Sequence, residues 1–118
     1  MKLWLDKAKD DLRVSESNFK IKELSVAAIF CQQSVEKALK AVYIKKHKQL
    51  APKTHDILFL ATKVDLPDNL ADEVDSLTDV YMESRYPDIK ETIKLKEENV
   101  SKFIKSAKKV LEWCEKQI

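Results

Sequence analysis

The sequence predicts an all-α fold: an antiparallel up-and-down bundle of four long helices with one short extra helix. It contains no glycine and only three prolines, so tight hairpins that need a positive backbone φ have no natural residue. The alternation of apolar and polar residues that marks half-buried strands is also missing, and helix-favouring Ala, Leu, Lys and Glu dominate. Because 118 residues support one core, we expect residues 1–118 to form a single domain.

The first helix is expected at residues 2–20, with Trp4 closing one end of the core. Its apolar side is formed by Leu5, Ala8, Leu12 and Phe19. Residues 20–23 leave room only for a turn, so the second helix should run antiparallel to the first.

The rest of the fold is expected to surround residues 24–44, in a second helix that continues to about His47. One side of this helix is apolar and consists of Leu24, Ala28, Cys31, Val35, Ala38, Leu39 and Val42. The opposite side carries a polar row of Gln33, Glu36, Lys37 and Lys40, within an arc of roughly 100°. Because apolar side chains flank this row, we predict that it faces a ligand or a partner surface, with a solvated polar face as the alternative.

Prolines divide the rest of the chain, at Pro52, Pro67 and Pro87. Thr54 is expected to cap a short third helix, and Asp68 a fourth. The third helix carries the apolar residues Ile57, Leu58, Leu60, Ala61 and Val64. The core positions of the fourth are expected at Leu70, Val74, Leu77 and Tyr81. The final helix is expected at residues 90–117, with Val100, Phe103, Ala107, Val110, Leu111 and Cys114 facing the core.

Charge is distributed unevenly along the chain, although the net charge is only +2. Residues 65–91 hold nine acidic side chains against two basic ones, a net charge of −7. The remainder holds 20 basic and 11 acidic side chains, a net charge of +9. This asymmetry suits a polyanionic ligand on the basic part or a partner of opposite sign; acids that only keep a helix solvated are the alternative.

The two cysteines, Cys31 and Cys114, form no CxxC pair, and each lies on an apolar helical face. We therefore expect buried free thiols in a reducing compartment. No signal peptide, transmembrane run or basic targeting segment is visible, so a cytoplasmic location is expected.

Few catalytic motifs are present. His47, His55 and the two cysteines share no metal-ligand spacing, and HExxH is missing, so neither a metal nor another cofactor is expected. The absence of glycine excludes glycine-rich phosphate loops. Nothing in the sequence favours Ser–His–Asp or Cys–His catalysis.

Two short clusters stand out. Thr54-His55-Asp56 lies at the entrance to the third helix, where capping and local hydrogen bonding offer a simple explanation. Arg85-Tyr86-Pro87-Asp88 lies at the exit of the fourth helix. It is either a helix stop with an Arg–Asp pair or a phosphate site, with the guanidinium holding the anion and Tyr86 offering a stacking surface.

Taken together, QQSVEKALKA, THDI and ESRYPD, in this order on these elements, resemble the HEPN family (higher eukaryotes and prokaryotes nucleotide-binding domain). The resemblance covers nearly the whole chain. It implies a four-helix up-and-down bundle with a short extra helix, usually as a homodimer. Many prokaryotic members are small stand-alone proteins encoded beside a minimal nucleotidyltransferase, and several such pairs act as toxin and antitoxin.

The resemblance also implies a set of ligand-binding residues. The polar row of the family's second long helix falls on Gln33, Glu36, Lys37 and Lys40, and the His-Asp of the short helix on His55 and Asp56. The arginine near the end of the next long helix falls on Arg85. Tyr86, Pro87 and Asp88 match a pattern common in the most similar branch.

One departure from the family pattern bears on activity. Ribonuclease members carry Arg, four to six residues, then His, and cut RNA without a metal at the dimer cleft. After Arg85 the eligible positions hold Lys90, Glu91 and Thr92, so the imidazole that usually assists attack by the 2′-hydroxyl is missing.

Three functions follow, in order of preference. The first is a non-catalytic module that binds a nucleotide or an RNA phosphate in a dimer groove lined by Lys37, Lys40 and Arg85. The second is a protein–protein partner of a nucleotidyltransferase, with no free ligand of its own. The third is a metal-independent endoribonuclease that works despite the missing histidine.

Overall fold

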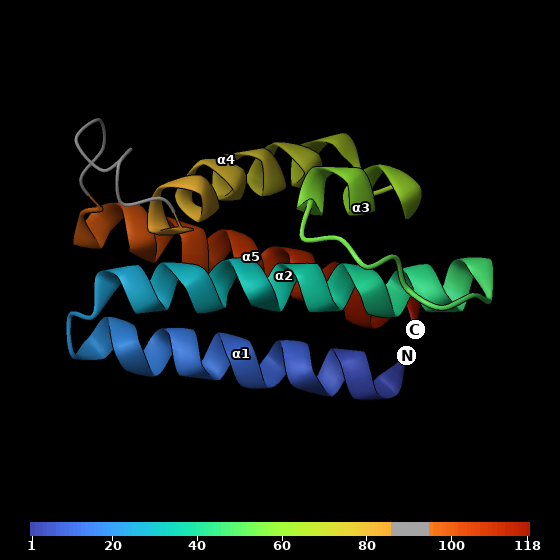
Figure 1. Ribbon diagram of the computed structural model, residues 1–118, viewed down its shortest axis with the longest axis horizontal. Helices are drawn as coiled ribbons and strands as arrows, with labels where there is room; N and C mark the ends of the chain where they lie inside the picture. The colour runs from blue at the N-terminus through green and yellow to red at the C-terminus, as the bar shows by residue number, and fades with distance from the viewer. Residues whose placement is uncertain (86–94) are drawn as a thin grey trace.

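The structure is a computed structural model that describes the backbone of residues 1–85 and 95–118 and the side chains of residues 1–78 and 95–118. The described helices are α1 (Lys2–Lys20), α2 (Leu24–His47), α3 (Ile57–Lys63), α4 (Asp68–Arg85) and α5 (Glu97–Gln117). The four long helices alternate in direction along the long axis of the bundle, and α3 is the short extra helix (Figure 1). The predicted all-α fold is therefore confirmed.

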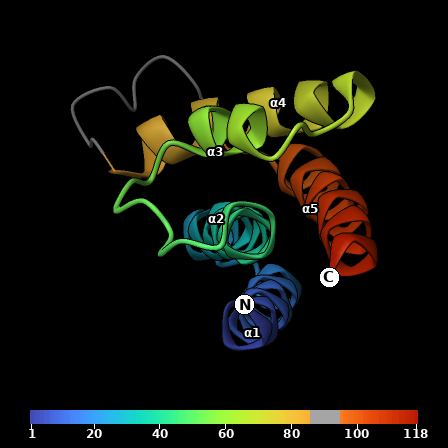
Figure 2. The same ribbon diagram turned by 90° about the vertical axis from the view of Figure 1, so that its right-hand side faces the viewer.

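The helix α2 is the centre of the bundle, as the sequence predicts. It contacts each of the four other helices. Viewed down the bundle, α1 lies below α2, α5 lies to one side, and α3 and α4 cover it from above (Figure 2). Its predicted apolar side is buried except at its first residue, Leu24, which is half-buried. Because neighbours surround this apolar helix, the polar groups that it carries must find partners or lie at an edge.

The buried face of α1 differs slightly from the predicted one. Its buried residues are Leu5, Ala8, Asp11 and Ser15, whereas Leu12 and Phe19 are half-buried. Small Ala8 and Ser15 allow α1 to approach α2 closely, and the Ser15 hydroxyl donates a 2.6 Å hydrogen bond to the Ala27 carbonyl. The larger apolar side chains therefore lie at the edges of this contact.

The N-cap of α3 is Asp56, so the prediction of Thr54 is wrong. The Asp56 carboxylate accepts a hydrogen bond from the Phe59 N–H at 3.1 Å, as an N-cap does. The Thr54 hydroxyl, two residues before the cap, instead accepts a hydrogen bond from the Asp56 N–H at 3.1 Å. Thr54 therefore holds the backbone just before the cap, and Asp56 accepts the hydrogen bond at the start of the helix.

The starts of α4 and α5 also differ from the predicted ones. The first hydrogen bonds of α4 go to the carbonyl of Pro67, so Asp68 is already inside the helix rather than its cap. The helix α5 begins at Glu97 and not at residue 90, because Lys96 has an extended backbone, with φ −109° and ψ 155°. Acidic residues in its first turn suit the positive end of the helix dipole. The predicted core residue Tyr81 lies outside the described side chains.

Both cysteines are free and buried, as predicted. Desolvation by burial raises the pKa of the Cys31 thiol and of the Cys114 thiol to about 12. The Cys31 thiol donates a hydrogen bond to the Phe103 carbonyl at 3.1 Å. Because the thiolate is the reactive form, both groups act as packed side chains at neutral pH. In the described part of the chain, no helix has the length and apolar character needed to cross a membrane.

A chain without glycine must place other residues at left-handed backbone positions. Lys22, Lys48 and Asp65 have φ values of 62°, 53° and 56°. Lys48 ends α2, and its N–H bonds to the Ile44 carbonyl at 2.9 Å. A side chain with a Cβ is strained there, whereas glycine is not.

We therefore expect Lys48→Gly to raise the free energy of unfolding, by about 1 kcal/mol, as measured by urea denaturation. The matched control is Lys45→Gly, which places glycine inside the same helix and should lower the free energy of unfolding by about 1 kcal/mol. If both variants were destabilised equally, the strain at Lys48 would be absent.

Candidate functional site

Three charged or polar side chains meet at the C-terminal half of α2, and we call Glu36, Lys40 and His55 the Glu36 cluster. The Lys40 Nζ lies 3.2 Å from Glu36 Oε2, and the His55 Nδ1 lies 2.9 Å from Glu36 Oε1. The side chains of Glu36 and Lys40 are only 7% and 8% exposed, whereas that of His55 is 64% exposed. A buried carboxylate thus uses both oxygens on partners, and one of those partners faces the solvent.

The backbone around these residues explains their placement. Glu36 and Lys40 are four residues apart on α2 and so share one face. His55 immediately precedes the Asp56 cap, which fixes the chain as it enters α3. The Gln32 amide donates a 3.4 Å hydrogen bond to the His55 carbonyl, which ties this segment to α2.

The helix α1 closes the other side of the cluster. The Lys40 Nζ lies 5.4 Å from the centroid of the Trp4 ring, in a cation–π contact. One helical turn earlier, Lys37 forms an ion pair with Asp11 of α1, whose side chain is 11% exposed. Both ammonium groups of the predicted polar row are therefore held by partners within the same chain.

The predicted polar row is thus not an open, solvated face. Glu36 and Lys40 are buried, and Gln33 and Lys37 are half-buried. The row is covered by α1 on one side and by the segment before α3 on the other. This excludes the solvated alternative for Glu36 and Lys40, and it means that Lys40 does not line an open groove within one chain.

The other predicted ligand residues have different positions. Asp56 is exposed, but one of its carboxylate oxygens serves the α3 cap. Arg85 is the last residue of α4, and its side chain lies outside the described ones. Tyr86 and Asp88 lie outside the described residues altogether. The predicted meeting of Arg85 with the polar row therefore stays a prediction.

Three residues that contact the site were not predicted as site residues: Trp4, Asp11 and Gln32. The position of Asp11 could have been predicted from the sequence. It lies three residues after Ala8 and four before Ser15, and this spacing places it on the buried face of α1. Gln32 is only 1% exposed, more buried than its predicted neighbour Gln33, and its Oε1 has no hydrogen-bond partner among the described residues. Within the same described part, no group of three His, Cys, Asp or Glu side chains is placed to hold a metal ion.

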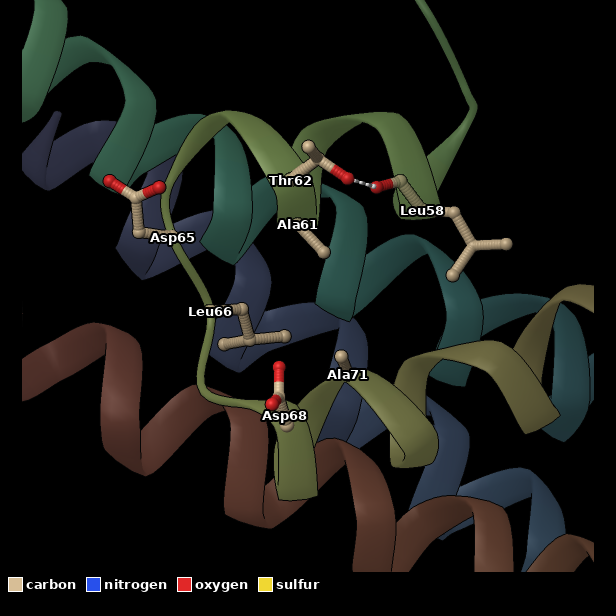
Figure 3. Close-up of a pocket in the computed structure, with 7 residues that line it drawn as sticks. All are labelled: Leu58, Ala61, Thr62, Asp65, Leu66, Asp68 and Ala71. Atoms are coloured by element: carbon tan, nitrogen blue, oxygen red, sulfur yellow. Dashed lines mark hydrogen bonds between the residues drawn. The ribbon is translucent and has the colours of Figure 1, made fainter.

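A second feature is a cleft of about 320 Å³ between α3 and the start of α4 (Figure 3). It is lined by Leu58, Ala61, Thr62, Asp65, Leu66, Asp68 and Ala71. Leu58 and the adjacent Phe59 are 37% and 41% exposed, and Leu50 in the preceding loop is 92% exposed. Of these three, Leu58 lines the cleft, and Phe59 follows it in the chain. Exposed apolar side chains beside a cleft are typical of a contact surface.

These features define a class of protein: a small helical module built around one central helix that carries a buried ionic cluster. The chain belongs to the HEPN family, since the model of the HEPN domain matches residues 1–117.

Two solved structures have the same fold. The chain is 23% identical to TT1696 from Thermus thermophilus, with a TM-score of 0.84 over 99% of this chain and 97% of that chain. It is 20% identical to ST0689, an archaeal HEPN homologue, with a TM-score of 0.71 over 98% of this chain and 95% of that chain. No curated protein matches the chain by sequence.

The Glu36 cluster predicts a specific pattern of stability. Lys40→Met leaves the Glu36 carboxylate buried without its ammonium partner, which should lower the free energy of unfolding by about 3–5 kcal/mol in urea denaturation. Adding Glu36→Gln removes the orphaned charge and should restore most of that loss.

The control is Lys9→Met, which breaks the exposed Lys9–Glu115 ion pair at 2.8 Å. Exposed pairs contribute at most about 1 kcal/mol, so this variant should be close to wild type. A loss for Lys40→Met no larger than that for Lys9→Met would show that the Glu36–Lys40 pair is not desolvated.

Proposed function

We propose that this HEPN domain is a non-catalytic module that binds the phosphate of a nucleotide or of RNA. The observation that carries the proposal is the exposed His55 imidazole, which is oriented by a buried carboxylate. Because a carboxylate only accepts hydrogen bonds, His55 Nδ1 is the protonated nitrogen towards Glu36. His55 Nε2 is then the nitrogen that remains for a ligand.

The charge balance of the site indicates that Lys37 and Lys40 alone do not bind the phosphate. Glu36 and Asp11 neutralise Lys40 and Lys37 within the chain. Further positive charge for a phosphate must therefore come from elsewhere. Arg85 is the residue that we propose, since its planar guanidinium binds phosphate with two hydrogen bonds.

The remaining predicted residues have subordinate roles in the proposal. Gln33, which is half-buried beside the cluster, offers an amide to a base or a sugar. Tyr86 offers a stacking surface, and Asp88 a carboxylate that keeps the guanidinium in place. Asp56 acts through the α3 cap by fixing the backbone next to His55.

The sequence argues against an endoribonuclease. The four-to-six spacing after Arg85 contains no histidine, so the imidazole that the usual acid–base chemistry needs is missing at that position. His55 is oriented by Glu36, but it precedes α3 and does not have the spacing from Arg85 that the ribonuclease motif requires. We therefore propose that His55 binds the ligand and does not catalyse cleavage.

Isothermal titration with ATP, GTP and a short RNA tests the proposal. We expect at least one of the three to bind, and we expect His55→Ala and Arg85→Ala each to weaken the binding by tenfold or more, as the loss of one charge-assisted hydrogen bond does. The matched control is His47→Ala, which removes the other imidazole, 2.8 Å from the Lys63 carbonyl, and should leave the affinity unchanged.

Two outcomes would contradict the proposed function. One is heat of binding that neither His55→Ala nor Arg85→Ala alters, or no binding of any of the three ligands. The other is cleavage of labelled RNA by the wild-type protein that disappears in Arg85→Ala, which would identify a ribonuclease.

We further propose that the module works in the cytoplasm as a homodimer beside a minimal nucleotidyltransferase, in a toxin–antitoxin-like pair. The cleft between α3 and α4 favours this second role, because Leu58 lines it and, with the adjacent Phe59, exposes apolar surface. Of the two acids that line the cleft, Asp65 pairs with Lys46, and Asp68 suits a basic side chain of a partner. A partner of a nucleotidyltransferase with no free ligand of its own remains the alternative to nucleotide binding.

Co-expression with a nucleotidyltransferase encoded beside this chain tests the second role. We expect the two proteins to co-purify, and we expect Phe59→Ser combined with Leu58→Ser to reduce the recovered partner by tenfold or more. The matched control is Leu3→Ser, which alters an apolar side chain that is 70% exposed on α1. If the double variant and the Leu3→Ser control recovered equal amounts of the partner, the contact would not involve Leu58 and Phe59.

A further inference from the structure

The edge at which α1 and α5 meet has a regular pattern of charge. The two helices run antiparallel, and oppositely charged side chains pair across their edge in three places. These pairs are Lys9–Glu115 at 2.8 Å, Glu16–Lys108 at 3.3 Å and, at the end of the bundle, Lys22–Glu97 at 3.5 Å. Each cation therefore faces an anion on, or close to, the opposite helix.

The pattern is broken between the second and the third pair. There, Lys20 and Lys105 line the same open hollow of about 180 Å³. Both are exposed, and neither forms an ion pair with an acidic side chain in residues 1–78 and 95–118. With Lys108 the hollow holds three ammonium groups against the single carboxylate of Glu16. The three other places on this edge each pair a cation with an anion, but here the like charges of the lysines repel each other. A bound anion would remove this repulsion.

The hollow also has uncharged lining residues. They are Phe19, Ile104 and Ser101. Phe19 is half-buried and lines the hollow. Ammonium groups and a partly exposed aromatic ring in one hollow are the combination on which single-stranded nucleic acids bind, because the phosphate meets the cations and a base stacks on the ring.

We propose that this hollow is a second binding site, for a phosphodiester and its adjacent base in a single-stranded nucleic acid. Lys20 and Lys105 hold the phosphate from its two sides, and Phe19 supports the base. The inference rests on the proposed function and extends it from one nucleotide to a strand.

The hollow is separate from the Glu36 cluster. The cluster uses the N-terminal half of α1, at Trp4, together with α2 and the segment before α3. The hollow uses the C-terminal end of α1 together with α5. The helices α1 and α3 lie on opposite sides of α2 (Figure 2). The two sites can therefore be removed independently.

Fluorescence anisotropy with a labelled 20-nucleotide oligouridylate, at several salt concentrations, tests the proposal. Lys20→Gln combined with Lys105→Gln should weaken binding by tenfold or more. It should also reduce the slope of log affinity against log salt by about 0.7 for each cation removed. The matched control is Lys7→Gln combined with Lys116→Gln, which removes the same charge from the same two helices outside the hollow and should leave both quantities near wild type.

A second variant tests the charge pattern itself. Lys20→Glu supplies the missing carboxylate opposite Lys105, so the variant should stay folded with a melting temperature near that of wild type. It should nevertheless lose binding to the oligonucleotide by more than tenfold.

Several results would overturn the proposal. They are equal weakening by the double variant and its control, binding that is unaffected by Lys20→Glu, and binding of anionic phospholipid vesicles but not of the oligonucleotide. Titration with ATP separates this proposal from the proposed function. If the hollow has no role, ATP binding remains sensitive to His55→Ala; if the His55 site has no role, strand binding remains sensitive to the two lysines.

Discussion

The placement of one carboxylate, that of Glu36, constrains the rest of the structure. A charged side chain that is 7% exposed must be neutralised and hydrogen-bonded, because desolvation of an unpaired charge costs several kcal/mol. Its partners come from two places, Lys40 one turn later on α2 and His55 from the segment before α3. Trp4 of α1 then covers Lys40. One buried charge thus links α1, α2 and the entrance to α3.

This arrangement determines which groups of the central helix can reach a ligand. The cations Lys37 and Lys40 are occupied by Asp11 and Glu36, so they orient other residues more than they offer free charge. The exposed groups lie at the rim, where His55 faces the solvent. The more open cationic surface lies at the edge of α1 and α5, around the hollow that Lys20 and Lys105 line. This position agrees with the net charge of +9 outside residues 65–91.

Much of the fold could be predicted from the sequence, and the errors have physical reasons. Both ends of α1 and the end of α2 at His47 were predicted correctly, because periodicity and the turn at residues 20–23 are local signals. The cap of α3 was placed on Thr54 instead of Asp56, since both residues are good caps and the backbone decides between them. The start of α5 was placed too early, because nothing in the composition marks the extended backbone of Lys96.

The sequence alone determined the fold class, the central position of α2 and the polar row that it carries, because each depends on residue type and spacing along one helix. The tertiary structure decided what that row faces. Helical periodicity shows that Gln33, Glu36, Lys37 and Lys40 share a side, but it carries no information about the neighbouring element that covers that side. Contacts with Trp4, Asp11 and His55 come from other parts of the chain, and only packing brings them to α2.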